Sequence, residues 1–116
     1  MNHDRTAAHL ADMLAFCQEL RQLVPPDLPL DHFTRQRVLC LAVEKLFINL
    51  GEAAARLGDD AARFTAIPWR RVIGLRNILA HGYEQVAHEI LYLTILQELP
   101  ALEVELMAAL KSLTAP

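Results

Sequence analysis

Residues 31–58 read DHFTRQRVLCLAVEKLFINLGEAAARLG, and this stretch decides the fold. Apolar side chains recur along it at steps of four and three, and they form two rows. The first row is Leu39, Val43, Leu46, Leu50, Ala53 and Leu57, and the second is Cys40, Phe47 and Ala54. This spacing is typical of an α-helix, and a helix that is apolar on more than one face is central or lies at a subunit contact.

The ends and the middle of this predicted helix carry their own signals. Asp31 is a suitable N-cap, because its carboxylate can accept a hydrogen bond from a free backbone N–H of the first turn. Gly58 is a suitable C-terminal cap. Gly51 interrupts the pattern, where glycine costs ~1 kcal/mol relative to alanine. We therefore expect another helix to approach closely at Gly51.

Helical periodicity continues on both sides of this stretch, and no strand pattern competes with it. The predicted flanking helices cover about residues 4–23, 59–64, 68–82 and 88–113. Asp59 is the expected cap of the second of these, Pro68 the expected first residue of the third, and Pro100 should kink or divide the last. The short connections predict an all-α, mostly antiparallel bundle of four to five helices in one domain, residues 1–116.

Composition restricts the class of protein. Hydrophobic residues make up 53% of a 116-residue chain, so a partner or a self-interface is expected to cover surplus apolar surface. The sequence has no apolar run of membrane-spanning length and no signal-peptide pattern, so we expect a cytoplasmic protein. The two cysteines, Cys17 and Cys40, lie in apolar helical patterns and are expected to be buried free thiols.

Charge is distributed unevenly along the chain. The formal net charge is −3, yet residues 61–83 contain no Asp or Glu and include Arg63, Arg70, Arg71 and Arg76. This stretch can carry a positive field on an acidic protein. The same arginines could equally cover a solvated helix face.

The residues best suited to chemistry are Arg76, Asn77, His81 and Tyr83, which lie within eight positions. Arginine binds phosphate oxygens through a planar fork, and histidine exchanges protons near neutral pH. On one helix Arg76 and His81 are separated by roughly 140° around the axis. A second copy of the helix, related by a twofold axis, would bring two of each into one cleft. The simpler alternative is a histidine that stabilises the helix dipole and an arginine in a surface pair. No metal-ligand spacing or phosphate-binding glycine loop is present, so no metal or cofactor is expected.

These residues also carry a resemblance to a known family. Arg76-x-x-x-x-His81-x-Tyr83 resembles the signature of HEPN domains of the HepT-like toxin branch. The segment around Gly51-Glu52-Ala53, the block from Ile67 to Asn77 and the segment from Leu99 to Leu102 resemble further family segments. The resemblance covers about residues 4–113.

The resemblance implies a helical homodimer with a composite cleft where the two signature helices meet. It implies a metal-independent endoribonuclease that serves as the toxin of a type VII-like toxin–antitoxin module, with RNA as substrate. Arg76 and His81 would be catalytic, Asn77 would support the site, and Glu52 has no assigned role. The expected partner is a minimal nucleotidyltransferase antitoxin, which would transfer AMP onto Tyr83, and a larger hetero-oligomer with this partner stays open.

Two alternatives remain at this point. The chain could be a non-catalytic helical dimer that binds a nucleotide or RNA and docks the nucleotidyltransferase. It could also be a dimerisation protein in which Arg76 and His81 only stabilise the interface. Cleavage of RNA, binding without cleavage, or loss of the dimer in variants of these two residues would separate the three.

Overall fold

The computed structural model describes residues 3–81 and 88–114, and every regular element in these ranges is a helix. The elements are α1 (His3–Leu23), α2 (Leu30–Arg35), α3 (Arg37–Arg56), the 3₁₀ helix η1 (Gly58–Arg63), α4 (Trp69–Ala80), α5 (His88–Gln97) and α6 (Leu99–Thr114). The all-α prediction is confirmed. None of the described helices is long and apolar enough to cross a membrane.

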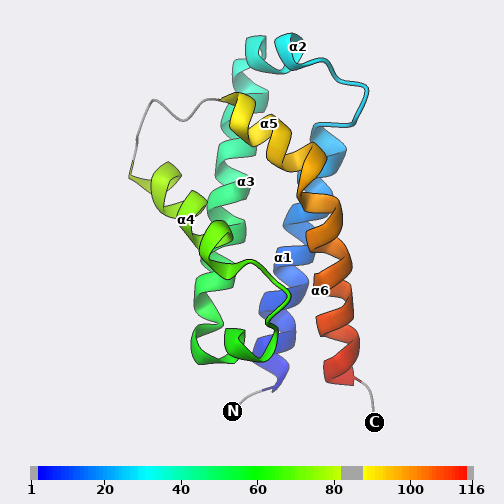
Figure 1. Ribbon diagram of the computed structural model, residues 1–116. Coiled ribbons are helices and arrows are strands. Elements are labelled where there is room, and N and C mark those ends of the chain that lie inside the picture. Colours follow the sequence, from blue (N-terminus) through cyan, green and yellow to red (C-terminus); the bar gives the residue numbers. More distant parts are fainter. Residues whose placement is uncertain (1–2, 82–87, 115–116) are drawn as a thin grey trace.

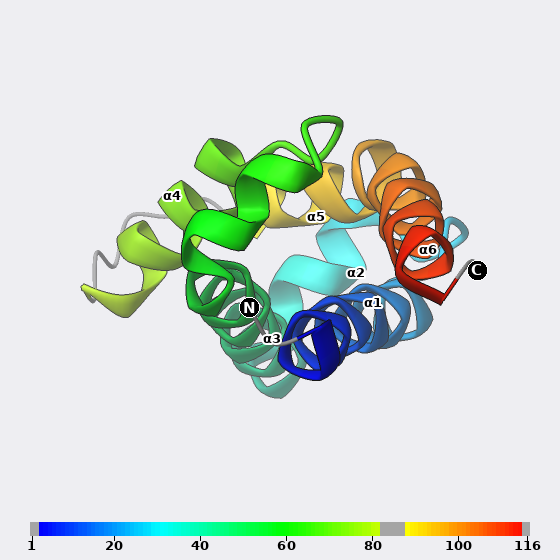
Figure 2. The same cartoon turned by 90° about the horizontal axis from the view of Figure 1, so that it is seen from below.

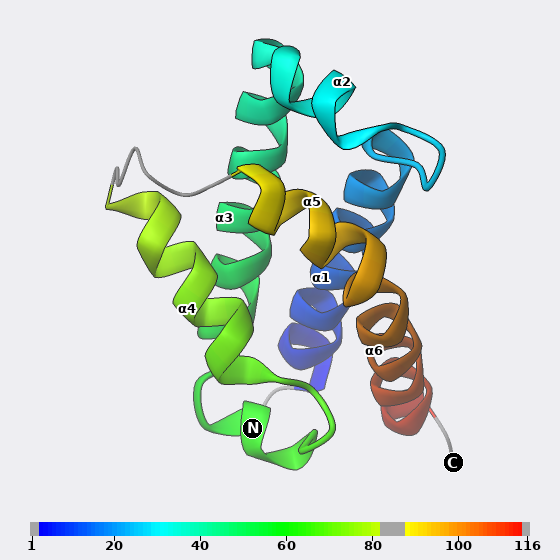
Figure 3. The ribbon, with the colours of Figure 1, turned by 45° about the horizontal axis from the view of Figure 1, so that its top comes forward.

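The long helices run antiparallel to their neighbours. Helices α1, α3 and α6 stand side by side, with α1 antiparallel to both α3 and α6 (Figure 1). Helix α4 packs mainly against α3, on the side away from α1, and viewed along the bundle it projects from the rest of the molecule (Figure 2). Helix α5 crosses the bundle and leads directly into α6 (Figure 3).

The predicted central helix is confirmed as α3, because it packs against both α1 and α4. Both of its apolar rows contribute buried residues, and α1 and α6 contribute further residues to the same core. The buried side chains include Leu10, Met13, Cys17 and Leu20 from α1, Cys40, Val43, Phe47, Leu50, Ala53 and Ala54 from α3, and Leu102, Leu106 and Ala109 from α6. Cys17 and Cys40 are free and buried, as predicted.

The predicted helix of residues 31–57 is divided, and this part of the prediction is wrong. Gln36 has an extended backbone (φ −95°, ψ 90°) and separates α2 from α3. The break turns α2 so that Phe33 is fully buried, and the centroid of its ring lies 5.7 Å from the ring centroid of Tyr92. Asp31 is not the N-cap, since α2 begins at Leu30 after Pro29.

Some of the other predicted ends agree with the structure. Gly58, which follows the C-cap residue Leu57 of α3, has a left-handed backbone (φ 54°), the conformation that favours glycine at a helix end. Asp59 does not cap η1, because it lies inside that helix, whose N-cap is Leu57. Pro68 is the N-cap of α4, one position before the first helical residue Trp69, so the predicted start is wrong by one residue. The division near Pro100 is confirmed, since α5 ends at Gln97 and α6 begins at Leu99.

Candidate active site on helix α4

Helix α4 lies against α3 at Gly51, as predicted from the glycine. A Cβ atom added at Gly51 would lie 2.1 Å from Cβ of Arg76, 2.8 Å from its Cγ and 3.1 Å from the carbonyl oxygen of Val72. Any side chain at position 51 would therefore push α4 outward. The glycine fixes the depth at which the stem of Arg76 lies against α3.

Two residues hold the guanidinium of Arg76. Its Nη1 donates a 2.6 Å hydrogen bond to Oδ1 of Asn77, and its Nη2 lies 3.8 Å from Oε1 of Glu52. Its Nε is buried and has no hydrogen-bond partner in the described part of the chain. An arginine offers five N–H donors, and the contacts to Asn77 and Glu52 occupy few of them. The guanidinium is thus oriented yet keeps donors for a ligand oxygen.

Glu52 connects Arg76 to a second arginine. Its Oε2 lies 3.8 Å from Nη2 of Arg56, one helical turn further along α3. The carboxylate is therefore shared by two guanidinium groups, and the three side chains together keep a net positive charge. Sequence reasoning left Glu52 without a role and missed Arg56. The four-residue spacing of Glu52 and Arg56 was the available signal for this pair.

His81 lies at the C-terminal end of α4, where it is the residue that follows the last helical turn. Its backbone N–H donates to the carbonyl oxygen of Asn77 at 3.2 Å, and its side chain is exposed. The described residues offer no hydrogen bond or ion pair to the imidazole. The ring is therefore accessible to a ligand, close to the carbonyl end of the helix, where positive charge is favoured.

One copy of α4 presents Arg76 and His81 in different directions. Arg76 lies toward α3, whereas His81 follows the end of the helix, and no hydrogen bond joins the two side chains within the described residues. Five residues of helix separate them by ~7.5 Å along the axis and roughly 140° around it. Tyr83, the third member of the predicted set, lies outside the described residues.

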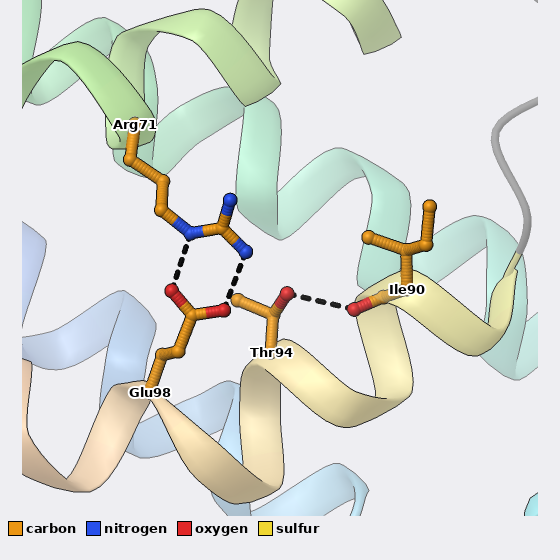
Figure 4. A network of polar contacts seen from close by, with 4 residues as sticks. All are labelled: Arg71, Ile90, Thr94 and Glu98. Carbon is orange, nitrogen blue, oxygen red and sulfur yellow. Dashed lines mark hydrogen bonds and ion pairs between the residues drawn. The ribbon is translucent and has the colours of Figure 1, made fainter.

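The other arginines of residues 61–83, the stretch without Asp or Glu, each have different neighbours. Arg71 forms a two-pronged ion pair with Glu98, which joins α4 to the junction of α5 and α6 (Figure 4). The hydrogen bonds that Arg71 donates to the carboxylate of Glu98 raise the pKa of Arg71. Arg63 lies over the ring of Phe64, 5.5 Å from its centroid, and Arg70 is an exposed residue of α4 itself. The stretch is thus only partly a free positive surface.

Comparison with known proteins gives consistent matches. Residues 13–109 match the family model described as "Ribonuclease HepT-like". The chain is 26% identical over 99 residues to the "Putative RNase MJ1380" of Methanocaldococcus jannaschii, covering 84% of this chain and 90% of that protein. It is 30% identical over 96 residues to the "Putative RNase TTE0752" of Caldanaerobacter subterraneus subsp. tengcongensis, covering 82% of this chain and 85% of that protein. No solved structure matches significantly.

Proposed function

The chain belongs to the ribonuclease HepT-like family, and on this premise we propose that it is a metal-independent endoribonuclease with Arg76 and His81 as its catalytic residues. The observation that best supports the proposal is the way in which Arg76 is held against α3. Gly51 admits its stem, while Asn77 and Glu52 orient its guanidinium. A guanidinium held in this way can stabilise charge that develops on phosphoryl oxygens.

The reaction follows from the two side chains. One imidazole, from His81, takes the proton from a 2′-hydroxyl, whose oxygen attacks the adjacent phosphorus. The bond from phosphorus to the 5′-oxygen breaks, and this oxygen receives a proton from His81 of the partner subunit. The products carry a 2′,3′-cyclic phosphate and a free 5′-hydroxyl. Arg76 neutralises the phosphoryl oxygens during the attack, so the scheme requires no metal.

A homodimer would supply the second histidine. Large apolar side chains remain exposed beside α4, and Ile78 and Ile90 are 46% and 51% accessible. Both line a groove between α4 and α5 that also includes Gly74 and Leu75. An exposed apolar groove next to the catalytic helix favours burial against a second copy, because a twofold contact there brings two copies of α4 together.

Cleavage of RNA by purified protein tests the proposal. Wild type should cut total cellular RNA in the presence of EDTA, and His81→Ala should lower the rate by ~10²–10⁴-fold. His32→Ala, which removes an exposed imidazole from α2, is the matched control and should cut normally. Equal cleavage by His81→Ala and wild type would refute the mechanism. RNA binding without cleavage by wild type would identify a binding module.

We further propose that the protein is the toxin of a two-gene module and that a minimal nucleotidyltransferase silences it by transferring AMP onto Tyr83. Added AMP would bring negative charge and bulk into a positive site, so an RNA phosphate would be repelled. Tyr83→Phe should escape both modification and silencing. Tyr92 is buried and donates to the carbonyl of Leu28, so Tyr92→Phe should still be modified. Modification of Tyr83→Phe at the normal level would contradict this proposal.

A further inference from the structure

A polar pocket lies between the N-terminal part of α1 and the C-terminal end of α3, away from the groove beside α4. It is lined by Arg5, Thr6, His9, Arg56, Leu57 and Asp60. Two guanidinium groups, one imidazole and one carboxylate are thus among the described residues that line this space. This composition favours an anion, because cations are bound by several oxygen ligands and anions by arginine forks.

Asp60 and His9, two polar residues of the pocket, differ in their hydrogen bonding. The carboxylate of Asp60 accepts a 3.1 Å hydrogen bond from the hydroxyl of Thr6, which holds η1 against α1. By contrast, Nδ1 of His9 is buried and has no hydrogen-bond partner among the residues that the structure describes. Buried polar atoms are nearly always paired, so this nitrogen indicates a group that the isolated chain does not supply.

Arg56 connects this pocket to the candidate active site. Its Nη2 lies 3.8 Å from Oε2 of Glu52, and Oε1 of the same carboxylate lies 3.8 Å from Nη2 of Arg76. Arg56 on α3 therefore shares a carboxylate with Arg76 on α4 and lines the same pocket as Arg5 and His9 on α1. An extended polyanion seated at Arg76 would meet Arg56 next and then the pocket.

We propose that Arg5, His9 and Arg56 bind a second phosphate of the RNA strand whose scissile phosphate lies at Arg76 and His81. The two arginines hold the phosphate oxygens, and Nδ1 of His9 donates a hydrogen bond to one of them. The inference rests on the proposed function, since it names a contact of that substrate outside the cleavage site. Backbone phosphates carry no base information, so this contact sets affinity and strand direction.

Binding of a 20-nucleotide RNA with 2′-O-methyl groups tests the pocket directly, because such a strand cannot be cut by attack of a 2′-hydroxyl. Arg5→Gln combined with His9→Gln should weaken binding by about tenfold. The slope of log K against log salt concentration should become shallower by ~0.7 for the lost phosphate contact. Arg5 is exposed, so Arg5→Gln alone keeps the test available if the double variant folds poorly.

Arg35→Gln is the matched control. It removes one positive charge from α2, at the opposite end of the bundle, where the Arg35 side chain is 75% exposed (Figure 1). The affinity of Arg35→Gln for the methylated strand, and the slope of log K against log salt concentration, should both match those of wild type. Equal weakening by Arg5→Gln and Arg35→Gln would show a general charge effect and overturn the inference, as would unchanged binding in the pocket variants.

Further outcomes separate this inference from the proposed function. Inorganic phosphate should compete with the strand only weakly, because a single phosphate ion fills either the pocket or the cleavage site, whereas the strand spans both. Binding of inorganic phosphate as tightly as the strand would overturn the inference. If wild type binds the methylated strand through the pocket yet cuts no RNA, the proposed function fails and the phosphate site stands. If wild type cuts RNA and the pocket variants bind and cut normally, only the phosphate site fails.

Discussion

Gly51 is a residue of α3 at which α4 lies in close contact. Replacing it with alanine would gain ~1 kcal/mol of helix propensity. The new Cβ would, however, lie 2.1 Å from Cβ of Arg76 and 3.1 Å from the Val72 carbonyl, so α4 must move. Overpacking of this kind costs up to about 3 kcal/mol, and we expect Gly51→Ala to lower the free energy of unfolding by about 2 kcal/mol. Urea denaturation measures this change in the free energy of unfolding.

Gly74 provides the control within α4. A Cβ added there meets no heavy atom within 4 Å, so Gly74→Ala should stabilise the protein by about 0.5–1 kcal/mol. RNA cleavage should fall in Gly51→Ala, because the stem of Arg76 is displaced. If both alanine variants stabilise the protein equally, α4 does not depend on close contact at position 51.

Cys17 makes stability depend on alkaline pH. Burial, reinforced by the Glu103 carboxylate and opposed by Arg21, raises the pKa of the Cys17 thiol from 9.0 to about 12. Between these values the unfolded chain loses this proton and the folded chain keeps it. Stability should therefore fall as pH rises above 9, by roughly 1.4 kcal/mol per pH unit from this group.

Thermal unfolding of wild type and Cys17→Ala between pH 8.5 and pH 10.5 measures this contribution. The variant should be less stable at pH 8.5, because it leaves a cavity, but its stability should fall less steeply with pH. Parallel curves for the two proteins would contradict a raised pKa at Cys17.

At the level of single residues, the sequence predicted the structural roles of residues whose role follows from a local sequence pattern. Gly51 interrupts an apolar row and Cys17 continues one, so both could be interpreted from spacing. Glu52 could not, because its role depends on Arg76, which arrives from a different helix. The Nδ1 of His9, which has no hydrogen-bond partner among the described residues, also escaped prediction, since burial of one ring atom depends on tertiary packing.

At the level of elements, periodicity predicted the helices better than their breaks. The division at Gln36 was missed because no proline or glycine lies between residues 30 and 50. It depends instead on long-range packing, in which Phe33 is buried against Tyr92 and the hydroxyl of Tyr92 donates to the carbonyl of Leu28. The division near Pro100 was predicted because proline acts through its own backbone.

The ion pair of Arg71 and Glu98 ties α4 to the opposite side of the bundle. Both side chains are partly exposed, at 56% and 43%, so the pair should stabilise the fold by no more than about 1 kcal/mol. Arg71→Glu should destabilise through repulsion between two carboxylates. The exchange of both, Arg71→Glu with Glu98→Arg, should recover most of the loss in urea denaturation. Additive losses in the double variant would show that the pair does not couple these helices.

At the scale of the whole molecule, the question is whether one chain or two complete the catalytic site. Arg76 lies toward α3 and His81 follows the end of α4, so we expect the pair that acts on one phosphate to come from two chains. Arg76→Ala and His81→Ala should each be inactive alone. Equal amounts of wild type and His81→Ala, unfolded and refolded together, should keep about a quarter of the cleavage of wild type at the same total concentration, because only about a quarter of the dimers then carry both imidazoles. Sedimentation of wild type should show a dimer at the same concentration. About half of wild-type cleavage in a mixture that native mass spectrometry shows to contain mixed dimers would mean that each active site is complete within one chain, and a composite cleft would have to be abandoned.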